Sequence, residues 1–426
     1  MSKTKQNLMN NEQYFTCFCE KYANNTRNLV LKGRDLIITK GKQLEDSDIK
    51  FLLIFLKQNQ DIVSLNLAYN QITCIGFKNL ITYLLVYKNI YKLNVQNNNI
   101  MEAGIDYMCE IGQNLHIKSL RLSGNKFGIE SSKKIALLLL KNPYLEYLDI
   151  AEIDQTISSL IYFTTVMRLD QPVYNETLKI LDISRPNPGC MYFFNAEQFA
   201  TLIGHMLRNN TCLFALHLQK CGFNCHDIEC MMINAQYNHT LHFLDLACNN
   251  IGDHGMHHLA NWLIKTSALC GLMLSRNIIT DHGARTVLYI KLFLPLRILS
   301  HTIPFSKLKF LDISFNKITD DGMVNILNSL KKISLIKSLR IFGNFLSHIT
   351  AKTIKRILLS KVLYQTNLDV KPYRVEDKWY CAQYPMDCSK EHFYDMIEPS
   401  TKNNKKAEIF SNIYKFNETS KIKKRL

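Results

Sequence analysis

The stretch LKFLDISFNKITDDGMVNILNSL, residues 308–330, contains two hydrophobic periodicities in succession. In its first half, Leu311 and Ile313 follow the alternation of a short β-strand. Asn316 then suits a turn, because its amide can satisfy backbone groups that a buried turn leaves unpaired. The apolar residues of the second half recur at helical spacing: Met323, Ile326, Leu327 and Leu330. One strand followed by one helix is therefore the predicted unit.

This unit recurs along the chain at a period of about 28 residues, as apolar, two variable, apolar, one variable, apolar, two variable, Asn, one variable, apolar. Seven copies keep the asparagine and start at Ile62, Ile90, Ile117, Leu241, Leu269, Leu308 and Ile336. Three more, starting at Leu145, Leu178 and Leu213, have Ile153, Pro186 and Cys221 in that ninth slot. Degenerate units near Arg34 and Gln365 bracket these ten recognisable repeats.

Stacking such units predicts the fold. The ninth-slot side chains should form a ladder of buried turns: Asn70, Asn98, Asn125, Cys221, Asn249, Asn277, Asn316 and Asn344. Asp253 and Asp320 sit where a helix N-cap would help. We expect an α/β solenoid shaped as a horseshoe, with a parallel β-sheet on its concave face and helices on its convex face.

The repeat length and the D-x-G-M helix start resemble the ribonuclease inhibitor subfamily of leucine-rich repeat proteins, and the resemblance covers residues 34–370. The final repeat IKSLRIFGNFL, followed by NLDVKPYRVEDKWYCAQ, is similar to the C-terminal end of one non-enzymatic protein of this kind. That similarity implies a nuclear or nucleolar and cytoplasmic interaction protein, with a role in stem-cell or germ-line maintenance and ribosome biogenesis.

The predicted domains follow the repeat. Residues 1–33 form an N-terminal cap, 34–364 the repeat array, 365–398 a C-terminal cap and 399–426 a disordered basic tail. Spacings longer than the period follow Leu145, Leu178 and Leu269, and we expect insertions there.

The chain carries a formal charge of +16, but residues 399–426 alone hold 8 basic and 2 acidic side chains. The body is mildly basic, so we do not expect nucleic acid as a partner except through this tail. The tail reads equally as a nuclear import signal or as a solvated end. Neither a secretory signal nor a membrane span is recognisable, which predicts a cytoplasmic or nuclear protein, possible nucleolar residence included, with its 13 cysteines as thiols.

The sequence contains none of the following common catalytic motifs. The motifs G-x-x-x-x-G-K-[ST], G-x-S-x-G and H-E-x-x-H are all missing, so we expect neither an enzyme nor a cofactor. A metal site is one hypothesis for the group Cys212, Cys221, Cys225, His226 and Cys230, with His254 and His258 on a following helix. The spacing is not C-x-x-C, which favours ordinary thiols and solvent-facing histidines. The sequons at Asn24, Asn175, Asn209, Asn238 and Asn417 are expected to be unused.

A partner surface follows from side-chain alternation, because residues flanking the inward-facing Leu and Ile point out of the concave face. We expect the partner to contact Arg121, Tyr147, Asp149, Asp182, His217, Phe243, Asp245, Met273, Phe310, Asp312, Arg340 and Phe342. The centre of this face is acidic and its later half is aromatic, which suits a protein partner.

An interaction scaffold is therefore the leading prediction. One alternative is a regulator of an enzyme, either ribonuclease inhibitor-like or GTPase-activating. The positive net charge argues against holding a cationic ribonuclease. The other alternative is a structural component of a cilium or the cytoskeleton.

Overall fold

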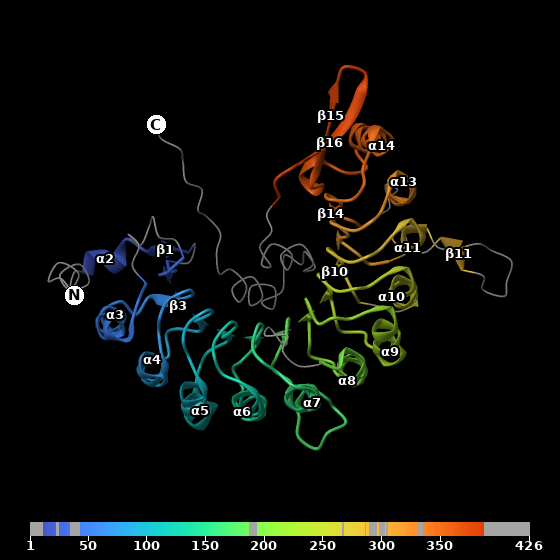
Figure 1. The fold of residues 1–426 in the computed structure, drawn as a ribbon. Helices are drawn as coiled ribbons and strands as arrows, with labels where there is room; N and C mark the ends of the chain where they lie inside the picture. The colour runs from blue at the N-terminus through green and yellow to red at the C-terminus, as the bar shows by residue number, and fades with distance from the viewer. Residues whose placement is uncertain are drawn as a thin grey trace. The chain divides into compact units, whose positions relative to one another are not determined.

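The computed structural model describes residues 12–22, 25–34, 43–186, 194–265, 268–285, 287–288, 296–297, 303, 306–330 and 335–386. They fall into two compact units. Unit 1 holds the described residues up to 167 and from 171 to 194, and unit 2 holds 168–170 and those from 195 onward. Each unit repeats a strand and a helix, as Figure 1 shows.

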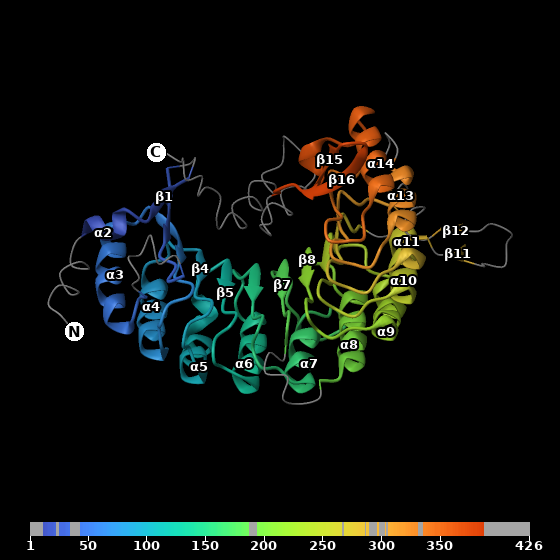
Figure 2. The same cartoon turned by 45° about the horizontal axis from the view of Figure 1, so that its top comes forward.

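In unit 1 the strands are β1 (Cys19–Lys21), β2 (Arg27–Val30), β3 (Ile62–Asn66), β4 (Lys92–Asn94), β5 (Ser119–Arg121), β6 (Tyr147–Asp149) and β7 (Ile180–Asp182). The helices are α2 (Glu12–Thr16), α3 (Asp46–Gln58), α4 (Cys74–Val86), α5 (Glu102–Ile111), the short η1 (Gly112–Asn114), α6 (Ile129–Leu139) and α7 (Ile157–Val166). Figure 2 shows α3 to α7 in a row along one side of these strands.

In unit 2 the strands are β8 (Ala215–His217), β9 (Phe243–Asp245), β10 (Gly271–Met273), β11 (Val287–Leu288), β12 (Leu296–Arg297), β13 (Phe310–Asp312), β14 (Ser338–Arg340), β15 (Val370–Val375) and β16 (Lys378–Gln383). The helices are α8 (Ala196–Arg208), α9 (Cys225–Ala235), α10 (Asp253–Lys265), α11 (Asp281–Arg285), α13 (Asp320–Ser329), α14 (His348–Leu359) and the short η3 (Gln365–Asn367).

Parallel pairing keeps one register through each unit. In unit 1, Leu65 pairs with Leu93, and the same slot continues through β5, β6 and β7. In unit 2, Leu244 pairs with Leu272 and then Leu311. All these leucines are buried, so a slip of one residue would turn the core side chains to the opposite face. The predicted α/β leucine-rich repeat solenoid is confirmed.

The sheet of unit 1 begins earlier than the sequence pattern suggested. Strand β2 (Arg27–Val30) already pairs in parallel with β3, whereas the sequence pattern predicts the first degenerate unit near Arg34. Leu29 and Leu31 supply the alternating core positions, and both are buried. Strand β1 pairs antiparallel with β2 and so covers what would otherwise be a free edge.

At the other end of the described chain, Leu368 bridges in parallel to Leu339, and the hairpin of β15 and β16 follows. The backbone N–H of Trp379 donates to His348 Nδ1 on α14 over 2.8 Å. The ammonium of Lys355 lies 4.2 Å from the centre of the Trp379 ring. Residues 387–426, including the basic tail, lie outside the described residues.

The ninth-slot asparagines join successive turns. Asn277 Nδ2 donates to Leu246 O of the preceding repeat over 3.1 Å and to Leu274 O of its own repeat over 3.0 Å. Its Oδ1 accepts the N–H of Ile251 over 2.9 Å. Asn98, Asn249 and Asn316 make the corresponding bonds, so each asparagine satisfies groups of two repeats.

Asp253 and Asp320 have a different task from the helix N-cap that we predicted. Each is the first residue of its helix, and its carboxylate reaches the next repeat. Asp253 accepts from Thr280 N and Thr280 Oγ1 over 2.9 and 2.7 Å, and Asp320 accepts from Ser347 N over 2.8 Å. The capping prediction was wrong because the first residue of each helix lies beside the residue that precedes the next helix, and its carboxylate bonds to that residue.

A second set of asparagines lies three residues before the first apolar slot of its repeat: Asn59, Asn114, Asn142, Asn175, Asn210 and Asn238. Asn238 Nδ2 donates to Leu207 O and Asn210 O over 2.7 and 3.0 Å, and its Oδ1 accepts the N–H of Leu241 over 2.8 Å. Asn175 and Asn238 are buried. Both sequon asparagines thus organise the entry to a strand.

Among the described residues, no helix is long and apolar enough to cross a membrane. No disulfide joins the cysteines in this part of the chain.

Candidate functional site

We define the strand face as the side of each sheet turned away from its helices. It is the surface on which the sequence pattern predicts a partner site. The predicted residues do lie on it side by side. In unit 1, Arg121 pairs with Asp149, and Asp149 pairs with Asp182 on adjacent strands. In unit 2, Asp245, Met273, Asp312 and Arg340 follow one another in the same slot.

The aspartates of this face bind the backbone of their own repeat. Asp149 Oδ1 accepts the N–H of Ala151 over 3.2 Å, and Asp182, Asp245 and Asp312 accept the N–H two residues later over 3.1, 3.1 and 3.0 Å. Short Asp and Asn side chains suit this local turn. An aspartate in this slot therefore fixes the end of its strand as well as supplying charge.

In unit 1, Asp149 is also the centre of a cross-strand network. Its Oδ2 accepts from Arg121 Nε over 3.1 Å and from Gln96 Nε2 over 2.7 Å. The guanidinium of Arg121 lies 5.9 Å from the centre of the Tyr147 ring. The Asp149 side chain is 2% exposed and that of Arg121 is 17% exposed, so the acidic group lies beneath the basic one.

Unit 2 repeats this arrangement with a histidine. His217 Nδ1 lies 3.0 Å from Asp245 Oδ2, and both side chains are fully buried. Gln219 Nε2 donates to the same oxygen. The carboxylate of Asp245 thus has partners on its own strand end and on the neighbouring strand.

The expected exposure of Phe243 and Phe310 is wrong, because both are fully buried. Their rings stack with centroids 6.2 Å apart, and the strand between them carries Gly271, which pairs with both and has no side chain to separate them. The guanidinium of Arg340 lies 5.5 Å from the centre of the Phe310 ring. These rings hold the strand face together rather than projecting from it.

The same correction applies to other predicted contact residues, which are buried along with these rings. They are Tyr147, Asp149, Asp182, His217, Asp245, Met273, Asp312 and Arg340. Neighbouring strands lie about 4.8 Å apart, so side chains of one slot cover one another. Of the predicted set, Arg121 and Phe342 keep intermediate exposure.

Asp312 and Asp369 in unit 2 both have raised pKa values. Burial raises the pKa of Asp312, and the nearby Asp245 acts in the same direction. Burial likewise raises the pKa of Asp369 to about 6, although its carboxylate accepts the N–H of Ile341 over 2.8 Å. Both groups are harder to ionise than an exposed aspartate.

Exposed side chains gather at the rim where the strands of unit 2 end. We define the aromatic rim as Arg276, Phe315 and Phe342. The guanidinium of Arg276 lies 4.4 Å from the centre of the Phe315 ring, and that ring meets Phe342 edge-on at 5.8 Å. Phe315 is 41% exposed. Arginine and aromatic side chains are enriched among residues that dominate protein interfaces.

The backbone aims the rim outward. The residue before the ninth slot has a positive φ in repeat after repeat, with 56° at Arg276, 53° at Phe315 and 83° at Gly343. Glycine and asparagine suit this conformation, whereas a bulky side chain there is an outlier. A Cβ at Gly343 would lie 2.4 Å from the Phe315 ring, so glycine makes room for it.

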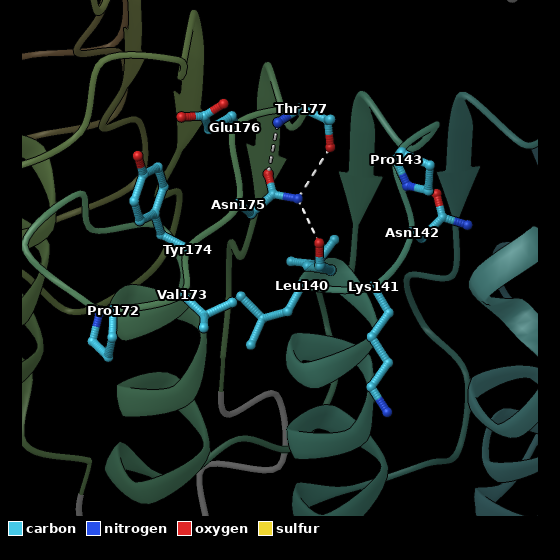
Figure 3. A pocket seen from close by; sticks show the side chains of 11 residues that line it. Leu140, Lys141, Asn142, Pro143, Pro172, Val173, Tyr174, Asn175, Glu176 and Thr177 are labelled. Carbon is cyan, nitrogen blue, oxygen red and sulfur yellow. Dashed lines mark hydrogen bonds between the residues drawn. The ribbon is translucent and has the colours of Figure 1, made fainter.

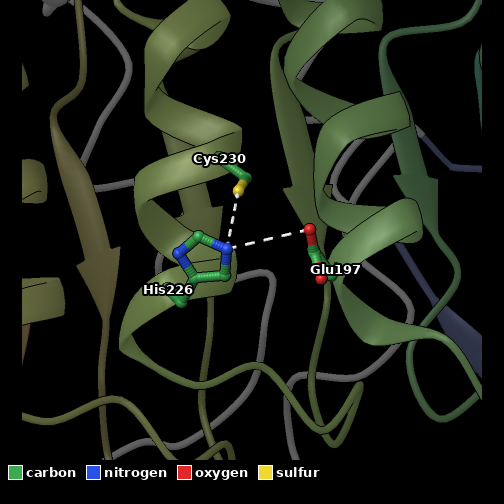
Figure 4. Close-up of side chains that lie close together, drawn as sticks. All are labelled: Glu197, His226 and Cys230. Atoms are coloured by element: carbon green, nitrogen blue, oxygen red, sulfur yellow. Dashed lines mark hydrogen bonds and ion pairs between the residues drawn. The ribbon is translucent and has the colours of Figure 1, made fainter.

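The Cys/His group singled out in the sequence is only partly brought together. Cys221 is buried in the turn ladder, and Cys225 Sγ accepts the N–H of Gly252 over 3.3 Å. His226 and Cys230 instead lie close to Glu197, which is not part of the group predicted from the sequence (Figure 4). The signal was the i, i+4 spacing of His226 and Cys230, but no sequence spacing revealed Glu197.

Unit 1 contains a pocket of about 420 Å³ between the end of α6 and the segment before β7 (Figure 3). Asn175 points into this region, where Nδ2 donates to Leu139 O over 2.6 Å and Oδ1 accepts the N–H of Leu178 over 2.8 Å. Asn142, also at the pocket, donates to Gly112 O and Leu115 O. The side-chain amides at this pocket therefore form hydrogen bonds with backbone groups of the same chain.

A family model described as "Leucine Rich repeat" matches residues 113–136, 237–260 and 306–327. Together with the strand-and-helix repeat and its asparagine ladder, this match supports an α/β leucine-rich repeat fold for the chain. Such repeat proteins typically serve as interaction scaffolds rather than as enzymes.

Among curated proteins, the chain resembles leucine-rich repeat-containing protein 34. The mouse (Mus musculus) protein is 29% identical over 247 residues, 58% of this chain and 54% of the relative. The ribonuclease inhibitor of Sus scrofa is 29% identical over 248 residues, 57% of this chain and 49% of the relative. The chain spans about half the length of the curated relatives it matches. A chain of the crystal structure of the yeast Rad7 and Elc1 complex covers 76% of this chain at 14% identity, with a TM-score of 0.39.

Proposed function

We propose that this protein is a non-catalytic scaffold that binds a protein partner on its strand face, with the aromatic rim of unit 2 as the main point of contact. The observation that carries this proposal is Phe315, a large apolar ring at a φ of 53° that is 41% exposed. The positive φ is common to this slot of the repeat, but here it carries an exposed aromatic ring that does not fill the core, and such rings are enriched at protein interfaces. The stacked Arg276 adds the cation typical of interface centres.

The buried carboxylates of the strand face determine which charge we expect on the partner. Asp149, Asp182, Asp245 and Asp312 occupy one slot of successive repeats within their units. A field from such groups favours a segment rich in lysine or arginine, and salt weakens its pull on the approaching partner. The contacts that we assign to the partner are made by the exposed rim.

The cellular setting that we propose follows the resemblance to leucine-rich repeat-containing protein 34: the nucleus or nucleolus and the cytoplasm, with a role in stem-cell or germ-line maintenance or ribosome biogenesis. The basic segment 399–426, outside the described residues, is our candidate for an import signal and for any contact with nucleic acid. A ribonuclease inhibitor role is disfavoured by the charge of +16, since a wholly cationic enzyme would be repelled by the net charge of the chain, whereas a single basic segment is attracted by the local acidic groups.

The test begins with affinity purification of the full chain, after which a recovered partner is purified and titrated against variants. Phe315→Asn places a residue suited to positive φ at the rim, so it should preserve stability and weaken binding at least tenfold, about 1.4 kcal/mol. Ile264→Asn, which alters an exposed apolar residue on α10, is the matched control. Binding that is unchanged by Phe315→Asn but lost with Ile264→Asn would place the partner on the helix side.

The charge component has its own test. Changing Asp149, Asp182, Asp245 and Asp312 together to Asn retains the side-chain oxygen that accepts the backbone N–H. Asp149 and Asp245 also accept hydrogen bonds through Oδ2, which an asparagine amide cannot replace, so circular dichroism first checks that the variant is folded. The folded variant should bind more weakly and lose salt dependence. A set of four acidic residues changed on the helices is the control, and an unaltered salt dependence in the first variant would remove the acidic face from the proposal.

A further inference from the structure

Three potential metal ligands converge on the outer surface of unit 2. Glu197 stands in the first turn of α8, and His226 and Cys230 stand one turn apart on α9. Figure 4 shows the imidazole of His226 between the other two side chains. His226 Nε2 lies 3.7 Å from Glu197 Oε1 and 3.6 Å from Cys230 Sγ. The three ligand atoms all lie within 4.8 Å of one another.

These distances suit one tetrahedral ion. Zinc binds cysteine sulfur at about 2.3 Å, histidine nitrogen at about 2.05 Å and carboxylate oxygen at about 2.1 Å. A tetrahedron with those bonds has ligand-to-ligand edges of roughly 3.4 to 3.6 Å. The two separations from His226 Nε2 are within a few tenths of an ångström of these edges, so rotation of the exposed Glu197 side chain would complete the set.

The surroundings of His226 resemble those of a metal-bound imidazole. Its second ring nitrogen, Nδ1, lies 3.5 Å from Glu229 Oε2, and a carboxylate at that position orients a ligand histidine and raises its basicity. The other oxygen of Glu229 lies 3.9 Å from His258 Nε2. Glu197, Asp227 and Glu229 all place negative charge near the Cys230 thiol, which favours a bound cation.

The helix that carries two of the ligands is held firmly at its start. Asn224 Oδ1 accepts the N–H groups of His226 and Asp227 over 2.8 and 3.2 Å, and Asp227 Oδ2 accepts the N–H of Asn224 over 2.8 Å. This reciprocal capping box fixes the first turn of α9, so the backbone of His226 is positioned before any ion binds. Glu197 comes from a neighbouring helix, and an ion here would link α8 to α9.

We propose that Glu197, His226 and Cys230 form a zinc-type site with three protein ligands and a fourth position open to water. The mixture of thiolate, imidazole and carboxylate favours zinc over magnesium or calcium, which prefer oxygen alone. This inference does not depend on the partner surface of the rim, which lies at the strand ends.

The test uses the full chain, stripped of metal with a chelator and titrated with Co²⁺ as a spectroscopic substitute for Zn²⁺. We expect one Co²⁺ per chain with a sulfur-to-metal charge-transfer band. Cys230→Ser should abolish that band, and His226→Gln and Glu197→Gln should each weaken binding at least about tenfold. All three side chains lie on the helix surface, so the variants should keep the circular dichroism of the parent protein.

The matched control is the pair Cys248→Ser with His254→Gln, which removes a thiol and an imidazole of unit 2 outside this cluster and should leave the titration unchanged. Zn²⁺ should also raise the melting temperature of the parent protein and of the control, but not that of Cys230→Ser. The proposal fails if the parent protein shows no charge-transfer band, if the band survives Cys230→Ser, or if the control loses it as fully.

Discussion

Asp253 and Thr280, 27 residues apart in the chain, are joined by two hydrogen bonds, one from the backbone N–H and one from the hydroxyl of the threonine. The same relationship links Asp281 to Thr319 and Asp320 to Ser347. Where cysteine replaces the aspartate, its sulfur accepts the N–H instead, as Cys225 does from Gly252. One side chain at the start of each of these helices thus connects it to the next.

Asp253→Ala should lower the free energy of unfolding by about 1 to 2 kcal/mol, because the N–H of Thr280 loses its acceptor in a half-buried position. Urea unfolding of unit 2 measures the change. His254→Ala, an exposed neighbour in the same helical turn, is the control and should be nearly neutral. Equal effects of the two substitutions would show that the bridge contributes nothing of its own.

Asn277→Ala should cost on the order of 1 to 3 kcal/mol, because a buried turn loses bonds that water cannot replace. The comparison is Asn250→Ala, which removes an exposed asparagine from the slot after the ladder. The ladder interpretation is abandoned if the urea midpoint of Asn277→Ala matches that of the parent protein.

Asp369→Asn should alter how stability depends on pH. The folded protein holds a proton on Asp369 up to a pKa of about 6, whereas the unfolded chain releases it near 3.8. The folded state therefore loses stability as pH rises from about 4 to 6, by on the order of 3 kcal/mol. The asparagine variant should lack this loss and be the more stable protein above pH 6.

Urea unfolding between pH 4 and pH 8 measures this difference. Asp377→Asn, an exposed change at the hairpin of β15 and β16, is the control and should follow the parent protein. Parallel pH curves for the parent protein and Asp369→Asn would contradict the raised pKa.

Phe310→Ala should destabilise unit 2 by about 3 to 5 kcal/mol, because it removes a fully buried ring and leaves a cavity beside Phe243. Phe315→Ala, at the rim, should cost far less, since that ring is exposed. Thermal melts of the two variants decide between a structural and a surface role. A mild effect of Phe310→Ala would restore the sequence-based view of that ring as a contact residue.

Deleting residues 399–426 should leave the melting temperature nearly unchanged and lower nuclear accumulation, because this segment holds much of the positive charge and no repeat pattern. Microscopy of the tagged full and truncated chains measures the distribution. The import half of the prediction is refuted by identical distributions, and the disorder half by a large drop in melting temperature.

The fold was readable from the sequence because period and slot chemistry are local. Leu311, Ile313 and Asn316 predict a strand and its turn within the nine residues 308–316. The bond from Asp253 to Thr280 was not readable, because the spacing that suggests a cap is the same whether the carboxylate bonds within its own helix or across to the next. Only the stacking of repeats distinguishes the two.

The prediction that side chains of the strand face are exposed was wrong for a similar reason. Alternation correctly puts Phe243 and Phe310 on the side away from the helices, yet their burial depends on Gly271 between them and on each other. One recurring sequence signal was left unused: an asparagine three residues before several repeats, as in Asn142 and Asn238, which marks the entry to the strand.

The bridge between repeats also has a consequence for how such a chain can change in length. Asp253 finds Thr280 after 27 residues, whereas Asp281 finds Thr319 after 38 and forms the same pair of bonds. The two anchoring points meet regardless of how much polypeptide departs between them. Evolution can therefore lengthen or replace a segment at this position, and a protein engineer could graft a foreign loop there, while the adjoining strands keep their alignment.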